Sequence, residues 1–152
     1  MPLAKLTREN LPLFRDRINT LKADTRPNWG TMTATGMLVH LRTLIEMSLE
    51  EGTYKDYSTF YSRYIMRFVA FHVLRTWPKG TVKAPGEFTP ESSSTFEEER
   101  AKLFAAFDRF AAAAAATPAR RTRHSLFGSL TLRYWTFMHA RHFEHHFQQF
   151  GI

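Results

Sequence analysis

The chain has 152 residues, of which 43% are hydrophobic, and this length and apolar content predict one globular domain spanning residues 1–152. It contains no cysteine, which excludes disulfides, thiolate metal sites and a cysteine nucleophile. Any bound metal must then be held by nitrogen or oxygen. No stretch of about 18 residues is free of charge and no apolar leader opens the sequence, so we expect a cytoplasmic protein with no transmembrane segment.

The net charge is +7, from 21 Lys and Arg against 14 Asp and Glu. Such an excess could attract nucleic acid or anionic lipid. The densest cluster is Arg120-Arg121-Thr122-Arg123-His124, and it has no interleaved aromatic residue. That composition favours a solvated connecting loop over a nucleic-acid surface. We therefore do not expect nucleic acid as a partner.

The first two predicted helices follow apolar spacings of three and four. The first begins after Asn10, a candidate N-cap, and ends near Asp24. The second is capped by Thr31 or Thr33 and ends at Gly52. The apolar faces consist of Leu11, Phe14, Ile18 and Leu21 in the first helix and Met37, Leu41, Leu44 and Met47 in the second, with His40 on the same stripe.

A third helical pattern, from Thr59 to Thr76, is apolar and aromatic nearly all round and is interrupted mainly by arginines at positions 63, 67 and 75. It has more apolar surface than one groove between helices covers, so we predict a homodimer that uses part of this helix. The segment 81–94 is rich in Pro, Gly, Ser and Thr and predicts a crossover loop.

Two further helices complete the prediction. One starts at a capping box formed by Thr95 and Glu98 and stops before Pro118. The last starts at Ser129 or Thr131 and stops near Gly151. Because no strand pattern competes with these five helices, we predict an all-α helical bundle with one long crossover.

The last helix carries a cluster of four histidines: His139, His142, His145 and His146. At 100° per residue, three of them (positions 139, 142 and 146) share one sector with Trp135, Phe143 and Phe150 and should face the interior. An unpaired ring nitrogen there would cost about 1–3 kcal/mol. A buried divalent cation would relieve that cost, so the spacing indicates a metal site.

We predict His40, His142 and His146 as the metal ligands. His142 and His146 have the i, i+4 spacing that lets two imidazoles reach one ion, and His40 lies mid-stripe on the second helix. Three neutral imidazoles would leave an open coordination position, which is typical of catalytic sites. His139 and His145 are candidates for acid/base catalysis, with His139 also a candidate fourth ligand, although packed histidines are the plainer interpretation of both.

Two other histidines have plainer interpretations. His124 either reaches the site or satisfies backbone groups at the start of the last helix, and we favour the second. His72 has no second ligating residue at the spacing of a metal site. We therefore predict that its side chain is packed against neighbours or lines a cavity.

Two sequence blocks resemble an uncharacterised branch of the DinB-like (YfiT-like) metalloenzyme superfamily. The first, Asn28-Trp29-Gly30-Thr31-Met32 with Met37-Leu38-Val39-His40-Leu41, is similar to the pattern Trp-Gly-x-Met, then Met-Leu-x-His-Leu. The other block is similar to the C-terminal end of that branch, which runs from His-Pro-x-Phe-Gly-x-Leu to His-His-x-x-Gln-Phe-Gly. In this chain it consists of His124-Ser125-Leu126-Phe127-Gly128-Ser129-Leu130, His142-Phe143-Glu144-His145-His146 and Gln149-Phe150-Gly151. Ser125 replaces the usual Pro.

The resemblance implies a DinB-type four-helix bundle, here with an additional helix between the second and third bundle helices. It implies that His40, His142 and His146 bind a divalent metal ion, most commonly zinc or nickel. Some members of the superfamily transfer small thiols or isomerise thiol adducts. We therefore expect a metal-dependent enzyme of transferase or hydrolase type, with a small thiol or thiol conjugate as its small-molecule substrate.

One alternative comes from a different class of protein. In a non-catalytic dimeric bundle, the metal would be structural or absent and the aromatic third helix would mediate protein binding. The two interpretations differ in solvent access, because an enzyme needs a path to the open metal position whereas a structural ion is sealed by a fourth protein ligand.

Overall fold

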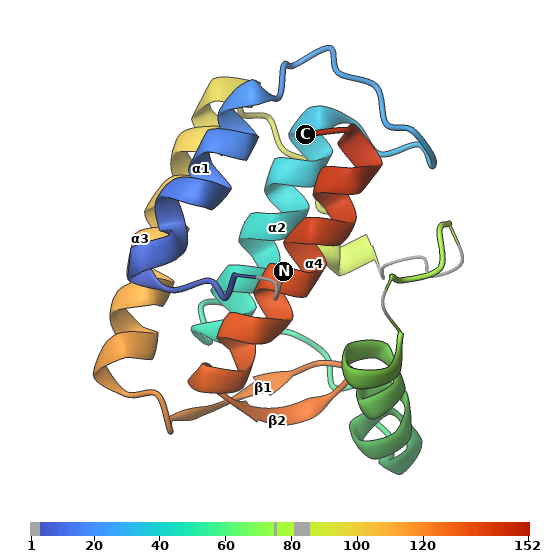
Figure 1. Ribbon diagram of the computed structural model, residues 1–152, viewed down its shortest axis with the longest axis vertical. Helices are drawn as coiled ribbons and strands as arrows, with labels where there is room; N and C mark the ends of the chain where they lie inside the picture. The colour runs from blue at the N-terminus through green and yellow to red at the C-terminus, as the bar shows by residue number, and fades with distance from the viewer. Residues whose placement is uncertain (1–3, 75, 81–85) are drawn as a thin grey trace.

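The computed structural model describes residues 4–74, 76–80 and 86–152 (Figure 1). Short 3-10 turns occur at Arg8–Asn10 and Gly86–Phe88. The longer elements are the α-helices α1 (Leu11–Thr20), α2 (Ala34–Ser48), α3 (Phe96–Ala116) and α4 (Leu132–Phe150), and the strands β1 (Arg121–His124) and β2 (Gly128–Thr131). The protein is therefore mostly helical, with a small two-stranded antiparallel sheet.

Side-chain caps set the starts of α2, α3 and α4, whereas Asn10, the predicted cap of α1, makes no side-chain hydrogen bond to that helix. The hydroxyl of Thr33 accepts the backbone N–H of Gly36 at 3.0 Å, which selects Thr33 rather than Thr31 as the cap of α2. The predicted capping box at Thr95 and Glu98 is present at the start of α3, so two of its first N–H groups are satisfied. Helix α1 ends at Thr20 rather than near residue 24 because the next residue has an extended backbone.

The helical character predicted for the chain is confirmed, but the expectation that it contains no strand was wrong. The cluster 120–124, predicted as a solvated loop, contains β1, which pairs with β2 in the register Thr122 opposite Leu130. Those two side chains are buried, whereas Arg121, Arg123 and Ser129 are exposed. The alternation has the period of a strand, but each strand is only four residues long and the arginines give β1 the composition of a loop.

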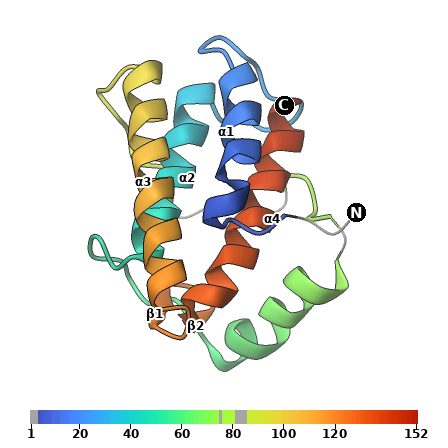
Figure 2. The same cartoon turned by 60° about the vertical axis from the view of Figure 1, so that its left-hand side comes forward.

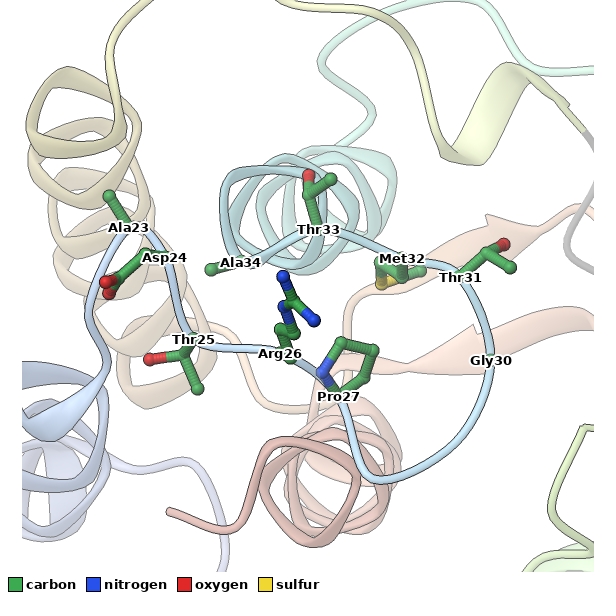
Figure 3. Close-up of a pocket in the computed structure, with 10 residues that line it drawn as sticks. All are labelled: Ala23, Asp24, Thr25, Arg26, Pro27, Gly30, Thr31, Met32, Thr33 and Ala34. Atoms are coloured by element: carbon green, nitrogen blue, oxygen red, sulfur yellow. The ribbon is translucent and has the colours of Figure 1, made fainter.

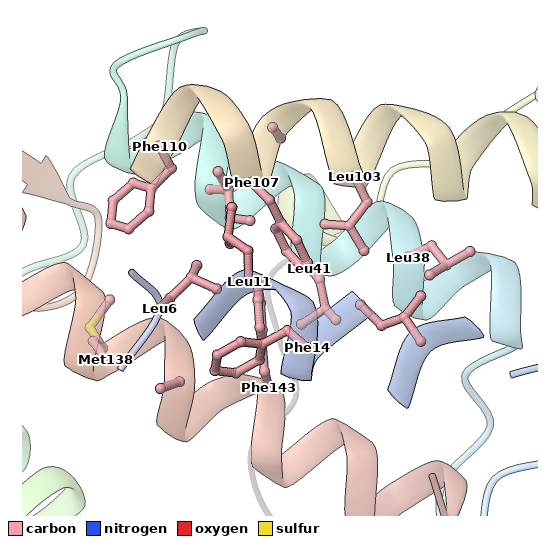
Figure 4. Packing of buried hydrophobic residues seen from close by; sticks show 14 of the residues in the cluster. Leu6, Leu11, Phe14, Leu38, Leu41, Leu103, Phe107, Phe110, Met138 and Phe143 are labelled. Carbon is pink, nitrogen blue, oxygen red and sulfur yellow. The ribbon is translucent and has the colours of Figure 1, made fainter. Parts of the chain in front are cut away.

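The four α-helices lie alongside one another around one hydrophobic core (Figures 1 and 2). Helix α2 contacts both α3 and α4, and α1 contacts α3. Phe143 of α4 packs edge-on against Phe14 of α1, with ring centroids 5.8 Å apart, and also contacts Phe107 of α3 at 5.4 Å. Residues that build this core include Leu6, Leu11, Phe14, Leu38, Leu41, Leu103, Phe107, Phe110, Met138 and Phe143 (Figure 4).

Residues 60–73 form the predicted additional helix, here named the aromatic helix, which lies outside the group of four α-helices (Figures 1 and 2). It is π-helical over Ser62–Met66 and Val69–Val73, as the hydrogen bond from the N–H of Leu74 to the carbonyl of Val69 shows. Phe71 of the aromatic helix is buried, but most of the large apolar residues of this helix are exposed. The predicted homodimer concerns this exposed face and stays a prediction.

Parts of two predictions lie outside the described residues. They are position 75 of the third predicted helix and positions 81–85 of the predicted crossover loop. Within the described parts of the chain, no helix is long and apolar enough to cross a membrane.

Candidate metal centre

The three predicted metal ligands meet between α2 and α4. His40 lies midway along α2, and His142 and His146 lie one turn apart on α4. The Nε2 atom of His142 is 3.0 Å from Nε2 of His40 and 3.0 Å from Nε2 of His146. One ring nitrogen from each histidine lies within 4.8 Å of the others. The fold thus brings the imidazole of His40 to a pair of imidazoles that begins 102 residues further along the sequence.

Hydrogen bonds on the far side of two rings fix their tautomers. Nδ1 of His40 lies 2.7 Å from the carbonyl oxygen of Phe88, which can only accept, so Nδ1 carries the proton. Nδ1 of His146 lies 2.8 Å from Oε1 of Gln149, whose amide nitrogen donates to the carbonyl of Trp29 at 3.0 Å. Nδ1 of His146 is therefore protonated too. Both neutral rings then direct the Nε2 lone pair toward His142.

These tautomers leave an unsatisfied lone pair unless a cation is bound. Neutral His142 carries at most one proton on Nε2, and that proton cannot make a good hydrogen bond to both His40 and His146. A metal ion would accept all three lone pairs. Three nitrogens about 2.0–2.1 Å from a tetrahedral ion lie roughly 3.3 Å apart, close to the 3.0 Å that separates Nε2 of His142 from Nε2 of His40 and from Nε2 of His146. The donor set therefore fits a divalent ion of the zinc or nickel type.

The three histidines are neutral at physiological pH, which is the form that binds metal. Burial lowers the pKa of His40 and lowers the pKa of His146 to about 3. Burial, reinforced by its histidine neighbours, also holds the pKa of His142 well below the ordinary value. His40 and His146 are buried whereas His142 is partly exposed, so the group is more open on the His142 side.

His145, predicted as an acid/base candidate, lies at the rim of this group. Its ring is half-buried and meets the ring of His146 edge-on, with centroids 5.2 Å apart. Trp77 covers both His145 and His142, at 5.6 Å and 5.9 Å between ring centroids, and Trp29 lies 5.9 Å from His145. Trp29 belongs to a recognised motif, but no pattern in the sequence singled out Trp77.

His139 lies outside the ligand group. Its Nε2 atom is 3.0 Å from the hydroxyl oxygen of Ser48. Because that hydroxyl donates its own proton to the carbonyl of Ile45 at 2.6 Å, it accepts from His139. The ring is also stacked on Trp135, with centroids 5.1 Å apart. The structure therefore gives His139 contacts that join α4 to the end of α2 rather than to the three ligands.

The two remaining histidines occupy separate places. Nδ1 of His124 accepts the backbone N–H groups of Leu126 and Phe127, at 3.0 Å and 3.2 Å, so this residue satisfies the backbone of the turn between the strands. His72, on the aromatic helix, is exposed, and its ring stacks on Phe137 of α4. Neither contributes a nitrogen to the ligand group found among the described residues.

A surface hollow of about 400 Å³ lies near the site but does not contain it. It is lined by the loop before α2, including Asp24, Arg26 and Thr33 (Figure 3). None of the three ligand histidines lines it. Gly30, which lines the hollow, lies beside the side-chain amide of Gln149, the hydrogen-bond partner of His146.

The fold and the site define a mostly helical protein with a candidate three-histidine metal centre shared by two helices. The chain belongs to the family described as "protein of unknown function (DUF1569)", which matches residues 2–151. No curated protein and no solved structure matches it. The family is thus established, whereas the relation to the DinB-like superfamily stays a prediction.

Proposed function

We propose that the protein binds one divalent metal ion, zinc or nickel, through Nε2 of His40, His142 and His146, on a four-helix bundle of DinB type. The observation that carries the proposal is the convergence of these three nitrogens, two of them with lone pairs fixed toward the third by Phe88 and Gln149. Buried imidazoles without a charge partner are costly unless a ligand uses their lone pairs.

We further propose that the site is catalytic. The exposure of His142 favours an open coordination position, since a sealed structural ion would need a fourth protein ligand, and the ligand group among the described residues holds three. A bound divalent ion would supply Lewis-acid chemistry toward a substrate thiol, a carbonyl or water. His145 is better placed than His139 to accept the proton released, because burial lowers its pKa and keeps it neutral beside the site.

The proposed substrate class rests on the resemblance to the DinB-like superfamily and on the aromatic residues around His145. Members of the DinB-like superfamily act on small thiols, and the aromatic rings of Trp29 and Trp77 beside His145 suit an apolar group on such a molecule. The proposed reaction is therefore a metal-dependent transfer or hydrolysis involving a small thiol or its conjugate. In the competing interpretation, the ion only joins α2 to α4.

The first experiment is the metal content of untagged protein by mass spectrometry, before and after loading with zinc or nickel. We expect about one equivalent in the natural sequence and less than about a tenth in His142→Ala. His72→Ala is the matched control, because this histidine is exposed and lies outside the ligand group. Loss of metal in both variants, or its absence from the loaded natural protein, would contradict the proposal.

A second measurement separates the enzyme from the structural alternative. The loaded protein is assayed with small thiols and thiol conjugates, alongside His145→Ala. An enzyme should turn over at least one of these classes, and the variant should keep its metal while losing rate by about 100-fold or more. Full metal content with no turnover, together with a large loss of thermal stability on chelation, would assign the ion a structural role.

A further inference from the structure

The aromatic helix presents a broad apolar face to solvent. Its side chains are more than one-third exposed at Phe60 (76%), Tyr61 (62%), Phe68 (59%), Val73 (57%), Tyr64 (56%), Ile65 (49%) and Val69 (37%). Isolated exposed apolar residues are ordinary, but seven on one short helix form a contiguous patch of the kind that marks an interaction surface. This surface is separate from the metal ligands and does not depend on the proposed function.

The positive charge of the chain is concentrated in two segments of the sequence, one of which contains the aromatic helix. Residues 57–86 and residues 109–143 contain no Asp or Glu, and together they hold eleven of the 21 Lys and Arg. Those eleven charges exceed the net charge of +7, so the rest of the chain is net acidic. The basic character of the protein therefore belongs to these two acid-free segments rather than to its whole surface.

The two acid-free segments touch each other at one end of the molecule (Figures 1 and 2). The hydroxyl of Ser62 donates to the carbonyl of Leu126 at 2.7 Å, and Phe71 packs against Phe127 with ring centroids 5.5 Å apart. Arg67 folds back over the ring of Tyr134, which leaves the outward face of the helix apolar.

Two exposed cations are tied to this helix: Arg63 belongs to it, and Arg63 and Arg123 each lie 3.7 Å from the same carboxylate oxygen of Asp56. One acidic side chain is thus shared by two arginines, and the local excess of charge is positive. An apolar helix beside an excess of arginine is the composition of a helix that lies in a membrane interface, with aromatic rings at headgroup depth.

We propose that the aromatic helix docks on a lipid bilayer that carries anionic headgroups. Its apolar side chains enter the interface and the surrounding arginines face the headgroups. A second copy of the chain fits less well, because a two-fold contact would bring the arginines beside one helix, which outnumber Asp56, against the same arginines of the other copy. Nucleic acid also fits less well, because the half of the face formed by Ile65, Val69 and Val73 is aliphatic and would stay exposed if bases stacked on the rings of the other half.

Vesicle flotation tests this inference with the full chain. Vesicles of phosphatidylcholine mixed with phosphatidylglycerol are compared with vesicles of phosphatidylcholine alone. We expect binding to the anionic vesicles that weakens as salt is raised. The double variant Ile65→Ser/Phe68→Ser should lower the partition coefficient by at least about tenfold, since two apolar side chains no longer enter the interface.

The matched control is Leu13→Ser, which removes an apolar side chain of similar exposure (55%) from α1. It should bind anionic vesicles like the natural sequence, and circular dichroism should show that both variants stay folded. Absence of binding to anionic vesicles, or equal binding by the double variant, would overturn the inference. A dimer in light scattering that Ile65→Ser/Phe68→Ser abolishes, without vesicle binding, would also overturn it and would assign the face to a second copy.

Discussion

The side-chain amide of Gln149 lies between His146 and the loop that carries Trp29. Its oxygen accepts from Nδ1 of His146, and its nitrogen donates to the carbonyl of Trp29, so the amide cannot flip without losing both hydrogen bonds. The same residue's backbone carbonyl accepts the N–H of Asn28 at 2.6 Å. Gln149 therefore holds the loop before α2 against the end of α4 while it sets the tautomer of a metal ligand.

Replacing Gln149 by Leu should weaken metal binding without removing a ligand. The variant loses the acceptor that keeps the proton on Nδ1 of His146, and partners of this kind contribute about 10–100-fold to metal affinity. Competition with a chelator of known affinity measures the change. Gln148→Leu is the control, because this neighbour is exposed and its amide bonds only to Glu144 on the same helix. Equal affinity in the two variants would show that Gln149 serves the loop alone.

At the scale of elements, the sequence predicts best where a pattern is long or tied to a cap. The four α-helices follow from apolar stripes and from the caps at Thr33, Thr95 and Thr131. The ligand pair on α4 follows from its i, i+4 spacing, and His40 from its place on the stripe of α2. The contact of Trp77 with His142 was not predictable, because it depends on how the chain after the aromatic helix folds back toward α4.

The small sheet was missed for a different physical reason. Each strand has only two inward positions, one of which in β2 is Gly128, and this is too few for a period of two to stand out. Arginines occupy the outward positions of β1. Its clearest signal is Gly128, whose backbone has a φ of +72°, a conformation that glycine adopts at little cost. A Cβ atom there would also lie 3.1 Å from the side chain of Arg63 in the aromatic helix.

Gly128→Ala should therefore destabilise the junction between the strands and the aromatic helix. The left-handed backbone alone costs about 1–2 kcal/mol for alanine, and displacement of Arg63 from its hydrogen bond with Ser58 adds to that loss. Urea denaturation measures the free energy of unfolding. Gly151→Ala is the matched control, since its φ is +68° but its added Cβ would make only an ordinary contact, 3.4 Å from Asn28. Equal losses would show that Arg63 moves aside freely.

At the scale of the whole molecule, the histidines couple the stability of the fold to pH. Six of the seven have a pKa lowered by burial: His40, His124, His139, His142, His145 and His146. In the unfolded chain each would titrate near its ordinary value of about 6.5. Acidification therefore protonates the unfolded state first, so the metal-free fold should be fully stable above about pH 6.5 and lose stability steadily below it.

His139 allows this coupling to be measured away from the metal ligands. It is 1% exposed, and burial, followed by the nearby His124, lowers its pKa to about 3. Between about pH 6.5 and pH 3 the unfolded state holds one more proton at this residue than the folded state, which removes about 1.4 kcal/mol of stability per pH unit. His139→Gln keeps a group that can donate to Ser48 but cannot be protonated. The contribution of position 139 to the pH dependence of the free energy of unfolding should therefore vanish in this variant.

Urea denaturation of both proteins in the presence of a chelator tests this expectation. At about pH 8 the variant should be less stable, because the stacking of His139 on Trp135 and its edge contact with Phe110 are lost. At about pH 5 the gap should narrow by about 2 kcal/mol, since only the natural chain then suffers from protonation of its unfolded state at position 139. The value at the higher pH serves as the control for packing. A gap that stays constant between the two pH values would mean that His139 takes up a proton as readily in the folded protein as in the unfolded chain, and it would contradict this expectation.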